Sequence, residues 1–141
     1  MGASMSELIT LPRTLVSQLF SLVQGSPTQE VCGLVGGRAG VPLRCYPVAN
    51  VSEDAERRFD MDPAEQIRAM REMRERGEDL VAIYHSHPSG SCQPSPIDIA
   101  QAAYPEALYL IISLGTRGVL EMRGFRMDGS GMREIELETG N

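Results

Sequence analysis

The sequence predicts a mixed α/β (α+β) protein in which helices flank a central sheet. Two observations favour this fold class. Short apolar segments bounded by glycine or proline are typical of strands, whereas longer segments with apolar residues every three or four positions are typical of helices. Along the chain these segments follow the order helix, strands, helix, strand, short helix, strands. This order favours a mixed sheet covered by helices.

A helix followed by a hairpin is expected at the start of the chain. Residues 11–24 carry leucine and valine at helical spacing, and Gly25 stops the pattern. Residues 30–37 and 41–50 are two apolar segments joined by a short turn that ends in Gly40. This arrangement predicts a β-hairpin.

A second helix is expected after a polar segment rich in acidic residues. A brief strand at 58–61 precedes it, and Asp62 as N-cap with Pro63 in the first turn marks its start. We expect this helix to reach about Arg76. Its arginines and glutamates form a solvated surface, and its apolar positions are Ile67, Met70 and Met73.

The second half of the chain predicts a central strand, a short helix and three further strands. Residues 79–87 are a largely buried strand that ends in the only two histidines of the chain. After a loop rich in proline, glycine and serine, Ser95 as N-cap begins a helix that runs to about Ala103. The further strands are expected at 107–114, 118–127 and 132–138.

Length and composition predict one soluble domain. At 141 residues we expect a single domain over 1–141, with its core at 7–138 and residues 1–5 as a tail outside it. No window approaches the ~18 to 20 consecutive apolar residues of a membrane helix. The first residues do not have the pattern of a signal peptide, and three widely spaced cysteines are typical of reduced thiols. We therefore expect a cytoplasmic protein with no membrane partner.

The charge inventory narrows the classes of partner. All 13 basic residues are arginine, which excludes Schiff-base chemistry on lysine. The net charge of -6 argues against a dedicated nucleic-acid binder, for which a basic face is expected. A small molecule or another protein is the expected partner, and the chain itself is expected to be a monomer or a homodimer.

His85, His87 and Asp98 form the candidate metal site. Side chains two positions apart on a strand point to the same face, so both imidazoles converge on one point. Asp98 joins them if the intervening loop folds back over the strand end. Two imidazoles, one carboxylate and an open fourth position suit a catalytic zinc ion. We therefore hypothesise a mononuclear hydrolase that holds one Zn²⁺ per chain.

Glu30 is the candidate general base. Hydrolysis of an amide needs a group that accepts a proton from water and passes it to the leaving amine. Glu30 stands at the start of an apolar segment, where a carboxylate needs a structural or chemical reason to be present.

Each candidate residue also has a structural interpretation. The histidines fit hydrogen-bonded core residues, and Asp98 fits a carboxylate favoured by the dipole of a helix N-terminus. Glu30 fits an ion pair with an arginine. Cys92, in the loop between the ligands, would close the metal site as a fourth ligand and make it structural.

These residues together resemble a known motif. Glu30, then His85-Ser86-His87, then Ser95 with Asp98 three positions later, is similar to the JAMM motif of the catalytic MPN-domain metalloproteases. The resemblance implies an MPN/JAMM-like (cytidine-deaminase-like) fold. It also implies that His85, His87 and Asp98 bind Zn²⁺, that Glu30 acts as general acid/base, and that Ser95 helps to hold the tetrahedral oxyanion.

The chain resembles the minimal prokaryotic branch of that family, in which GLVGG, RFDMDP and HSHPSG recur. This branch is associated with sulfur metabolism, where its members cleave small ubiquitin-like sulfur-carrier proteins after a C-terminal Gly-Gly. We therefore expect a zinc metallopeptidase of this type. Residues 58–61 are a candidate edge or flap for the extended tail, although a core position is the preferred interpretation of both Phe59 and Met61.

Two other functions are compatible with the motif. One is a non-catalytic MPN-type scaffold that binds partners and keeps the metal for stability. The other is a DNA-associated protein of the RadC type, since the segment around HSHPSG also resembles RadC-like proteins. Those proteins usually have asparagine between the histidines, where this chain has Ser86.

Overall fold

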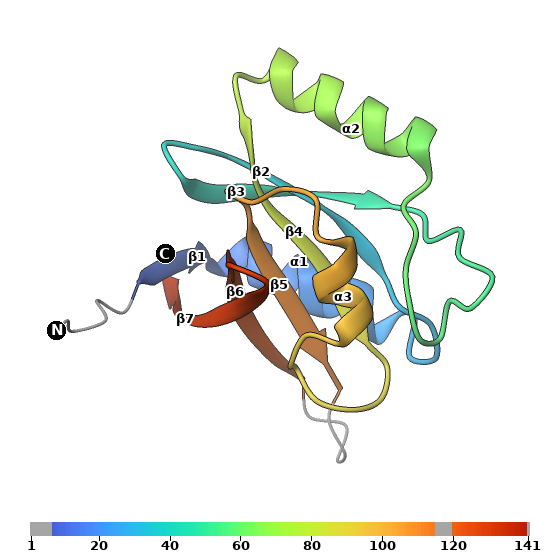
Figure 1. Cartoon of the computed structure of the whole chain (residues 1–141). Coiled ribbons are helices and arrows are strands. Elements are labelled where there is room, and N and C mark those ends of the chain that lie inside the picture. The colour runs from blue at the N-terminus through green and yellow to red at the C-terminus, as the bar shows by residue number, and fades with distance from the viewer. Residues whose placement is uncertain (1–6, 115–119, 141) are drawn as a thin grey trace, which may run out of the picture.

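The computed structural model describes residues 7–114 and 120–140, and these form one seven-stranded mixed sheet with three helices (Figure 1). The strand order is β1-β7-β6-β5-β4-β2-β3. The strands are β1 (Leu8–Pro12), β2 (Cys32–Arg38), β3 (Val41–Val48), β4 (Asp79–His87), β5 (Leu108–Ser113), β6 (Glu121–Asp128) and β7 (Gly131–Gly140). The helices are α1 (Arg13–Gln24), α2 (Pro63–Glu75) and α3 (Pro96–Gln101).

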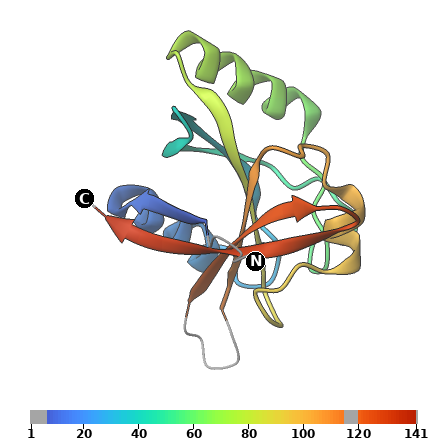
Figure 2. The same cartoon turned by 60° about the vertical axis from the view of Figure 1, so that its left-hand side comes forward.

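The sheet is mixed and curled. The pairs β1/β7 and β4/β5 are parallel and the other neighbours are antiparallel. The two edge strands of the sheet, β1 and β3, lie close to each other, so the sheet bends back on itself around α1 (Figure 2). The prediction of a mixed sheet flanked by helices is confirmed.

The central elements agree with the sequence prediction. β2 and β3 form the expected antiparallel hairpin, and β4 covers the expected residues. β4 pairs antiparallel with β2 and parallel with β5, and α3 lies in the connection between β4 and β5. The two histidines therefore stand at the C-terminal end of a strand with a neighbour on each side.

Other boundaries were predicted wrongly. The first helix begins at Arg13 because residues before it pair with β7 as strand β1. No strand forms at 58–61, where an isolated bridge joins Asn50 to Met61. α3 ends at Gln101, two residues early. Residues 118 and 119, expected to begin a strand, and the expected tail at 1–5 lie outside the described residues.

α2 begins as predicted but turns a different face to the sheet. Asp62 caps the helix by accepting a hydrogen bond from the Glu65 N–H at 3.1 Å. Its buried residues are Ala69 and Met73, whereas Ile67 is 60% exposed. The apolar stripe is therefore narrower than the sequence pattern indicates.

Alternation along β4 separates two cores. Ala82 and Tyr84 pack with α1 on one face of the sheet. Ile83 packs on the opposite face with Met73 of α2. Because His85 has the same parity as Ile83, both histidines belong to the face covered by α2 and α3.

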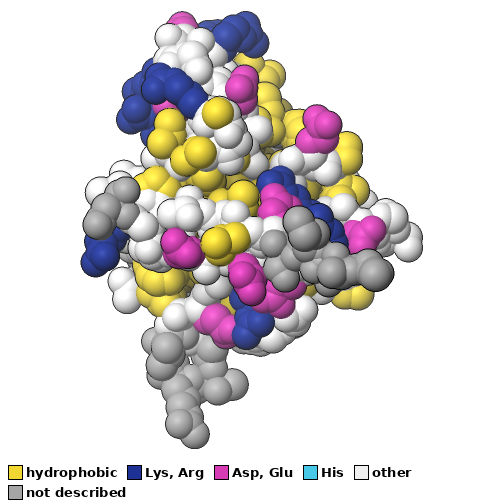
Figure 3. All heavy atoms as spheres, turned by 90° about the vertical axis from the view of Figure 1, so that its left-hand side faces the viewer, with side chains coloured by type: hydrophobic (Ala, Val, Ile, Leu, Met, Phe, Trp, Pro, Cys, Tyr) yellow, Lys and Arg dark blue, Asp and Glu magenta, His cyan; other side chains and the backbone are white. Residues whose placement is uncertain are grey.

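The described surface carries charges of both signs. In the view of Figure 3, basic side chains gather at one end of the molecule, and acidic and basic side chains lie together lower down. Arg123, for example, pairs with Glu121 and Glu134. No histidine is visible on this face, consistent with the burial of both histidines. None of the described helices is long and apolar enough to cross a membrane.

Candidate metal centre

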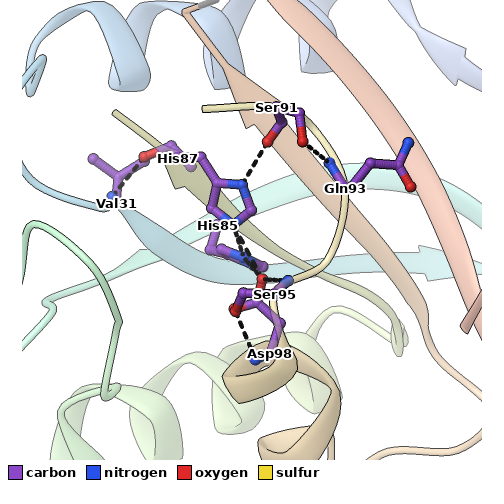
Figure 4. Close-up of polar contacts among 8 residues, drawn as sticks. Val31, His85, His87, Ser91, Gln93, Ser95 and Asp98 are labelled. Carbon is purple, nitrogen blue, oxygen red and sulfur yellow. Dashed lines mark hydrogen bonds and ion pairs between the residues drawn. The ribbon is translucent and has the colours of Figure 1, made fainter. Parts of the chain in front are cut away.

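His85, His87 and Asp98 bring three ligand atoms to one point (Figure 4). Asp98 Oδ2 lies 3.1 Å from His85 Nε2 and 3.0 Å from His87 Nε2. The two Nε2 atoms are 3.2 Å apart. Strand β4 supplies the histidines, and helix α3 supplies the carboxylate after the loop folds back.

The hydrogen bond of His87 to the loop fixes its tautomer. His87 Nδ1 lies 2.7 Å from the carbonyl oxygen of Ser91, which only accepts, so Nδ1 carries the proton. In the neutral ring, Nε2 then presents a lone pair to the Asp98 carboxylate. Two acceptors at this distance repel each other unless a proton or a metal ion lies between them. The backbone carbonyl behind a ligating histidine is also the usual outer partner in metal sites.

The spacing of the three atoms fits a small tetrahedral ion. Ligand atoms about 2.0–2.1 Å from Zn²⁺ at tetrahedral angles lie roughly 3.3 Å apart. The observed separations of 3.0 to 3.2 Å are close to that value. Cys92 does not belong to this group, because its buried thiol donates to the Glu121 carbonyl at 3.2 Å. Three protein ligands leave a fourth position open, as in catalytic sites.

The electrostatics of the cluster favour positive charge at its centre. Burial lowers the pKa of His85. Burial also disfavours the charged form of His87, but hydrogen bonds with Asp98 and the Ser91 carbonyl outweigh it and raise the His87 pKa. Burial of Asp98 acts in the raising direction, but hydrogen bonds from both histidines hold its pKa well below the usual range. The buried carboxylate therefore stays ionised beside two imidazoles.

Ser95 and Asp98 form a capping box at the start of α3. The Asp98 N–H donates to Ser95 Oγ at 3.0 Å, and the Ser95 N–H donates to Asp98 Oδ2 at 2.8 Å. The predicted N-cap is thus confirmed. Because Ser95 Oγ acts as an acceptor here, its hydroxyl proton is left for another partner. The oxyanion role of Ser95 stays a prediction.

Strand pairing places Glu30 beside the histidines. Cys32 is the partner of His85 in the antiparallel register. Val31 and Ser86 continue it, because the Val31 N–H donates to Ser86 Oγ at 2.9 Å and the Ser86 N–H donates to the Val31 carbonyl at 3.0 Å. Glu30 therefore lies level with His87, and side chains opposite each other share a face.

The carboxyl group of Glu30 is buried beside the candidate ligands. The residue is 4% exposed, and its Oε1 has no hydrogen-bond partner among the described residues. No described arginine pairs with it, so the ion-pair interpretation has no support in the described chain. Burial raises the pKa of Glu30 to about 7, and Asp98 acts in the same direction, while His87 opposes them. A carboxyl group with this pKa accepts and returns a proton near neutrality.

An apolar cavity of about 270 Å³ adjoins two of the candidate metal ligands. His85 and Asp98 form part of its wall, together with Tyr104 and Tyr109. Phe59 also lines it, and its ring stacks on that of His85 with 4.6 Å between centroids. The cavity gives the metal centre a neighbouring apolar space.

Sequence reasoning missed part of this environment. It treated Ser86 as the residue between two ligands, whereas Ser86 fixes the β4 end to the residue after Glu30. It preferred a core position for Phe59, which instead covers a metal ligand, while Met61 packs against the core as expected. Asn50, which binds the main chain of Glu30, was not singled out. An asparagine after an apolar strand carries no signal of such a contact.

Comparison with known proteins identifies the family of the chain. A family model described as prokaryotic homologs of the JAB domain matches residues 12–127. The chain belongs to this family. The predicted resemblance to prokaryotic JAMM proteins is therefore confirmed.

Several known proteins are similar to this chain over most of their length. A desampylase of Haloferax volcanii is 32% identical over 115 residues, which cover 80% of each chain. A CysO-cysteine peptidase of Mycobacterium tuberculosis is 29% identical over 126 residues, which cover 87% of this chain and 86% of the relative. A probable TtuB-protein conjugate cleaving protease of Thermus thermophilus is 34% identical over 112 residues, which cover 79% of this chain and 73% of the relative.

Solved structures show the same fold. A Desulfitobacterium hafniense protein has a TM-score of 0.83 at 33% identity, over 94% of this chain and 93% of that one. A JAB1/MPN domain protein of Archaeoglobus fulgidus has a TM-score of 0.63 at 18% identity, over 94% of this chain and 100% of that one. The expected MPN-type fold is confirmed.

Replacing Ser95 tests its structural contribution to the JAB-family site. We expect Ser95→Ala to lower the free energy of unfolding by about 1 kcal/mol, because the variant loses the side-chain cap of α3. Urea denaturation of the metal-free protein measures this change. Ser130→Ala, in the exposed β6–β7 turn, is the matched control and should leave stability unchanged. Equal stability of the two variants would contradict the capping role.

Proposed function

We propose that this chain is a zinc-dependent metallopeptidase that hydrolyses the amide bond after the C-terminal Gly-Gly of a small ubiquitin-like sulfur-carrier protein. One observation carries the proposal: beside three converging candidate ligand atoms lies the buried carboxyl group of Glu30, whose Oε1 has no hydrogen-bond partner among the described residues. The names of the relatives support the substrate class, since they include a CysO-cysteine peptidase and a protease for TtuB-protein conjugates.

His85, His87 and Asp98 would hold the zinc ion. When bound in such a site, zinc polarises a carbonyl group and lowers the pKa of water towards neutrality. The chain supplies the arrangement that makes this useful: the Ser91 carbonyl holds the His87 tautomer, and the capping box holds the Asp98 carboxylate. The hydrogen bond of His87 to the Ser91 carbonyl and that of Asp98 to the Ser95 N–H keep the ligand atoms directed at one point.

Glu30 and Ser95 carry out the proton transfer and the charge stabilisation. Glu30 accepts a proton as water attacks the carbonyl carbon of the scissile amide. It then gives this proton to the leaving nitrogen as the C–N bond breaks, which releases a carboxylate and an amine. The Ser95 hydroxyl donates to the oxyanion that forms in between. The pKa of about 7 suits Glu30 to both directions of transfer.

The surroundings of the site favour an extended tail without side chains. Phe59 covers His85 on one side, and α3 closes another side through Asp98. Two glycine residues pass between such walls without steric cost. The adjoining cavity is lined by apolar groups such as Ile83 and Ile111 and suits an apolar side chain elsewhere on the carrier.

Metal analysis of ligand variants tests the zinc site. We expect one Zn²⁺ per wild-type chain after dialysis, and less than a tenth of that for His87→Ala, because two remaining ligands bind zinc weakly. Cys92→Ala is the matched control, since its thiol faces the Glu121 carbonyl and not the ligands. Full zinc content in His87→Ala would contradict the assignment, as would activity that survives chelation.

Replacing Glu30 separates catalysis from metal binding. Glu30→Gln keeps the shape of the side chain but cannot accept the proton, so we expect kcat to fall by about 10²- to 10⁴-fold with full zinc content. Steady-state cleavage of a Gly-Gly-tailed carrier fusion, with zinc analysis of the same samples, measures both. Glu106→Gln, an exposed and remote carboxylate, should match the wild type. If Glu30→Gln cleaves at the wild-type rate, Glu30 is not the base.

Altered carriers test the demand for glycine. Changing the last glycine of the carrier to valine should lower kcat/KM by roughly 100-fold or more, because the new side chain meets the walls formed by Phe59 and α3. Mass spectrometry of the products locates the cleaved bond. Equal cleavage of both carriers would remove the Gly-Gly requirement. A zinc-loaded wild-type chain that cleaves no Gly-Gly carrier would overturn the proposed function in favour of a binding scaffold.

A further inference from the structure

Asn50 is the second residue after β3. Its side-chain amide uses all four of its hydrogen-bonding positions. Nδ2 donates to the Glu30 carbonyl at 3.0 Å and to the Arg58 carbonyl at 3.1 Å. Oδ1 accepts from the Ser52 N–H and the Asp60 N–H, both at 3.0 Å. The amide group has two donors and two acceptor lone pairs, so its capacity is filled.

These bonds join two separate parts of the site. One is the main chain of Glu30, the candidate base, just before β2. The other is the 51–61 segment, which carries Phe59 over the ring of His85. A further bond links the same two parts, because the Glu30 N–H donates to the Ala55 carbonyl at 2.7 Å. Both peptide groups of Glu30 that flank its Cα are therefore bound to the Asn50 side chain or to the segment it organises.

The side chain of Glu30 depends on this support. Oε1 is buried and has no hydrogen-bond partner among the described residues, so no polar contact of that atom fixes the carboxyl group. Its place beside His87 follows from where its main chain is held. A shift of about 1 Å in a catalytic group is enough to slow a reaction by about 10²-fold.

The geometry points to Asn50 as a positioning residue that holds the Glu30 main chain and the Phe59-bearing segment in one fixed arrangement at the metal centre. The catalytic part of this inference rests on the proposed function. Asn50 itself contacts none of the three metal ligands in the hydrogen bonds described, so its loss affects the base and the covering segment and not the ligand set.

Two substitutions separate the hydrogen bonds that the Asn50 side chain donates from those that it accepts. Asn50→Ala removes all four hydrogen bonds. Asn50→Asp keeps the size and the acceptor for Ser52 and Asp60 but cannot donate to the Glu30 carbonyl. A matched control is Asp62→Ala, which removes the cap of α2 in the neighbouring turn without touching Glu30. This control loses stability through the same region of the chain, so it reports what destabilisation alone does.

Steady-state kinetics with the zinc-loaded full chain test the inference at a temperature where all variants are folded. We expect both Asn50 variants to lose about tenfold or more in kcat with full zinc content, because the base is displaced while the three candidate ligands keep their own contacts. Asp62→Ala should have a lower Tm but a kcat within about twofold of the wild type. A kcat loss in the Asn50 variants no larger than that of Asp62→Ala overturns the inference.

Amide hydrogen exchange gives a second measurement that needs no substrate. In Asn50→Asp we expect faster exchange at the Glu30 amide but retained protection at the Asp60 amide, whereas Asp62→Ala leaves the Glu30 amide protected. Unchanged exchange at Glu30 in both Asn50 variants overturns the positioning role. A wild-type chain that cleaves no carrier refutes the proposed function separately, and the exchange result still decides whether Asn50 holds Glu30.

Discussion

The antiparallel register between β2 and β4 is the constraint on which the site depends. The pairing of Cys32 with His85 and of Val31 with Ser86 sets Glu30 level with His87. A slip of one residue would turn Glu30 to the other face of the sheet, away from the histidines. Just before β2, the Val31 N–H donates to the Ser86 hydroxyl oxygen, which extends the pairing of the two strands beyond Cys32. The sheet therefore sets which residue lies opposite His87 and on which face, and the contacts of the Glu30 main chain with Asn50 and Ala55 then hold it there.

The site concentrates polar groups that the fold alone does not satisfy. A neutral His87 presents a lone pair to Asp98, and the buried Oε1 of Glu30 has no hydrogen-bond partner among the described residues. Buried groups of this kind cost stability unless a ligand or a cation compensates them. Such groups on an otherwise apolar face, next to a cavity, are typical of a functional site.

Much of the fold and the ligand set was predictable from local patterns. The strand at 79–87, the hairpin before it and the cap at Ser95 depend on spacing and residue type, which are visible in a sequence. Strand β1 was not predictable, because only one of its five residues is buried and its partner strand β7 comes from the other end of the chain. The orientation of Ile67 was missed for a related reason: tertiary packing chose a narrower face than the periodicity.

The candidate site divides in the same way. His85 and His87 were found together because strand alternation is a local rule. The contacts of Asn50 and Phe59 were missed because they join an irregular segment to residues distant in the sequence, and no periodicity encodes them. A polar segment of this composition predicts only a loop.

The double use of Asp98 has a consequence for helix α3. A helix of six residues is too short to be stable by itself. Its first turn is held by the same carboxylate that completes the ligand set, since Asp98 Oδ2 accepts from the Ser95 N–H and also faces both histidines. If Asp98 binds the ion as proposed, ion occupancy and helical order at 96–101 are linked equilibria. A bound ion then stabilises the folded turn by the same free energy by which the folded turn favours binding of the ion.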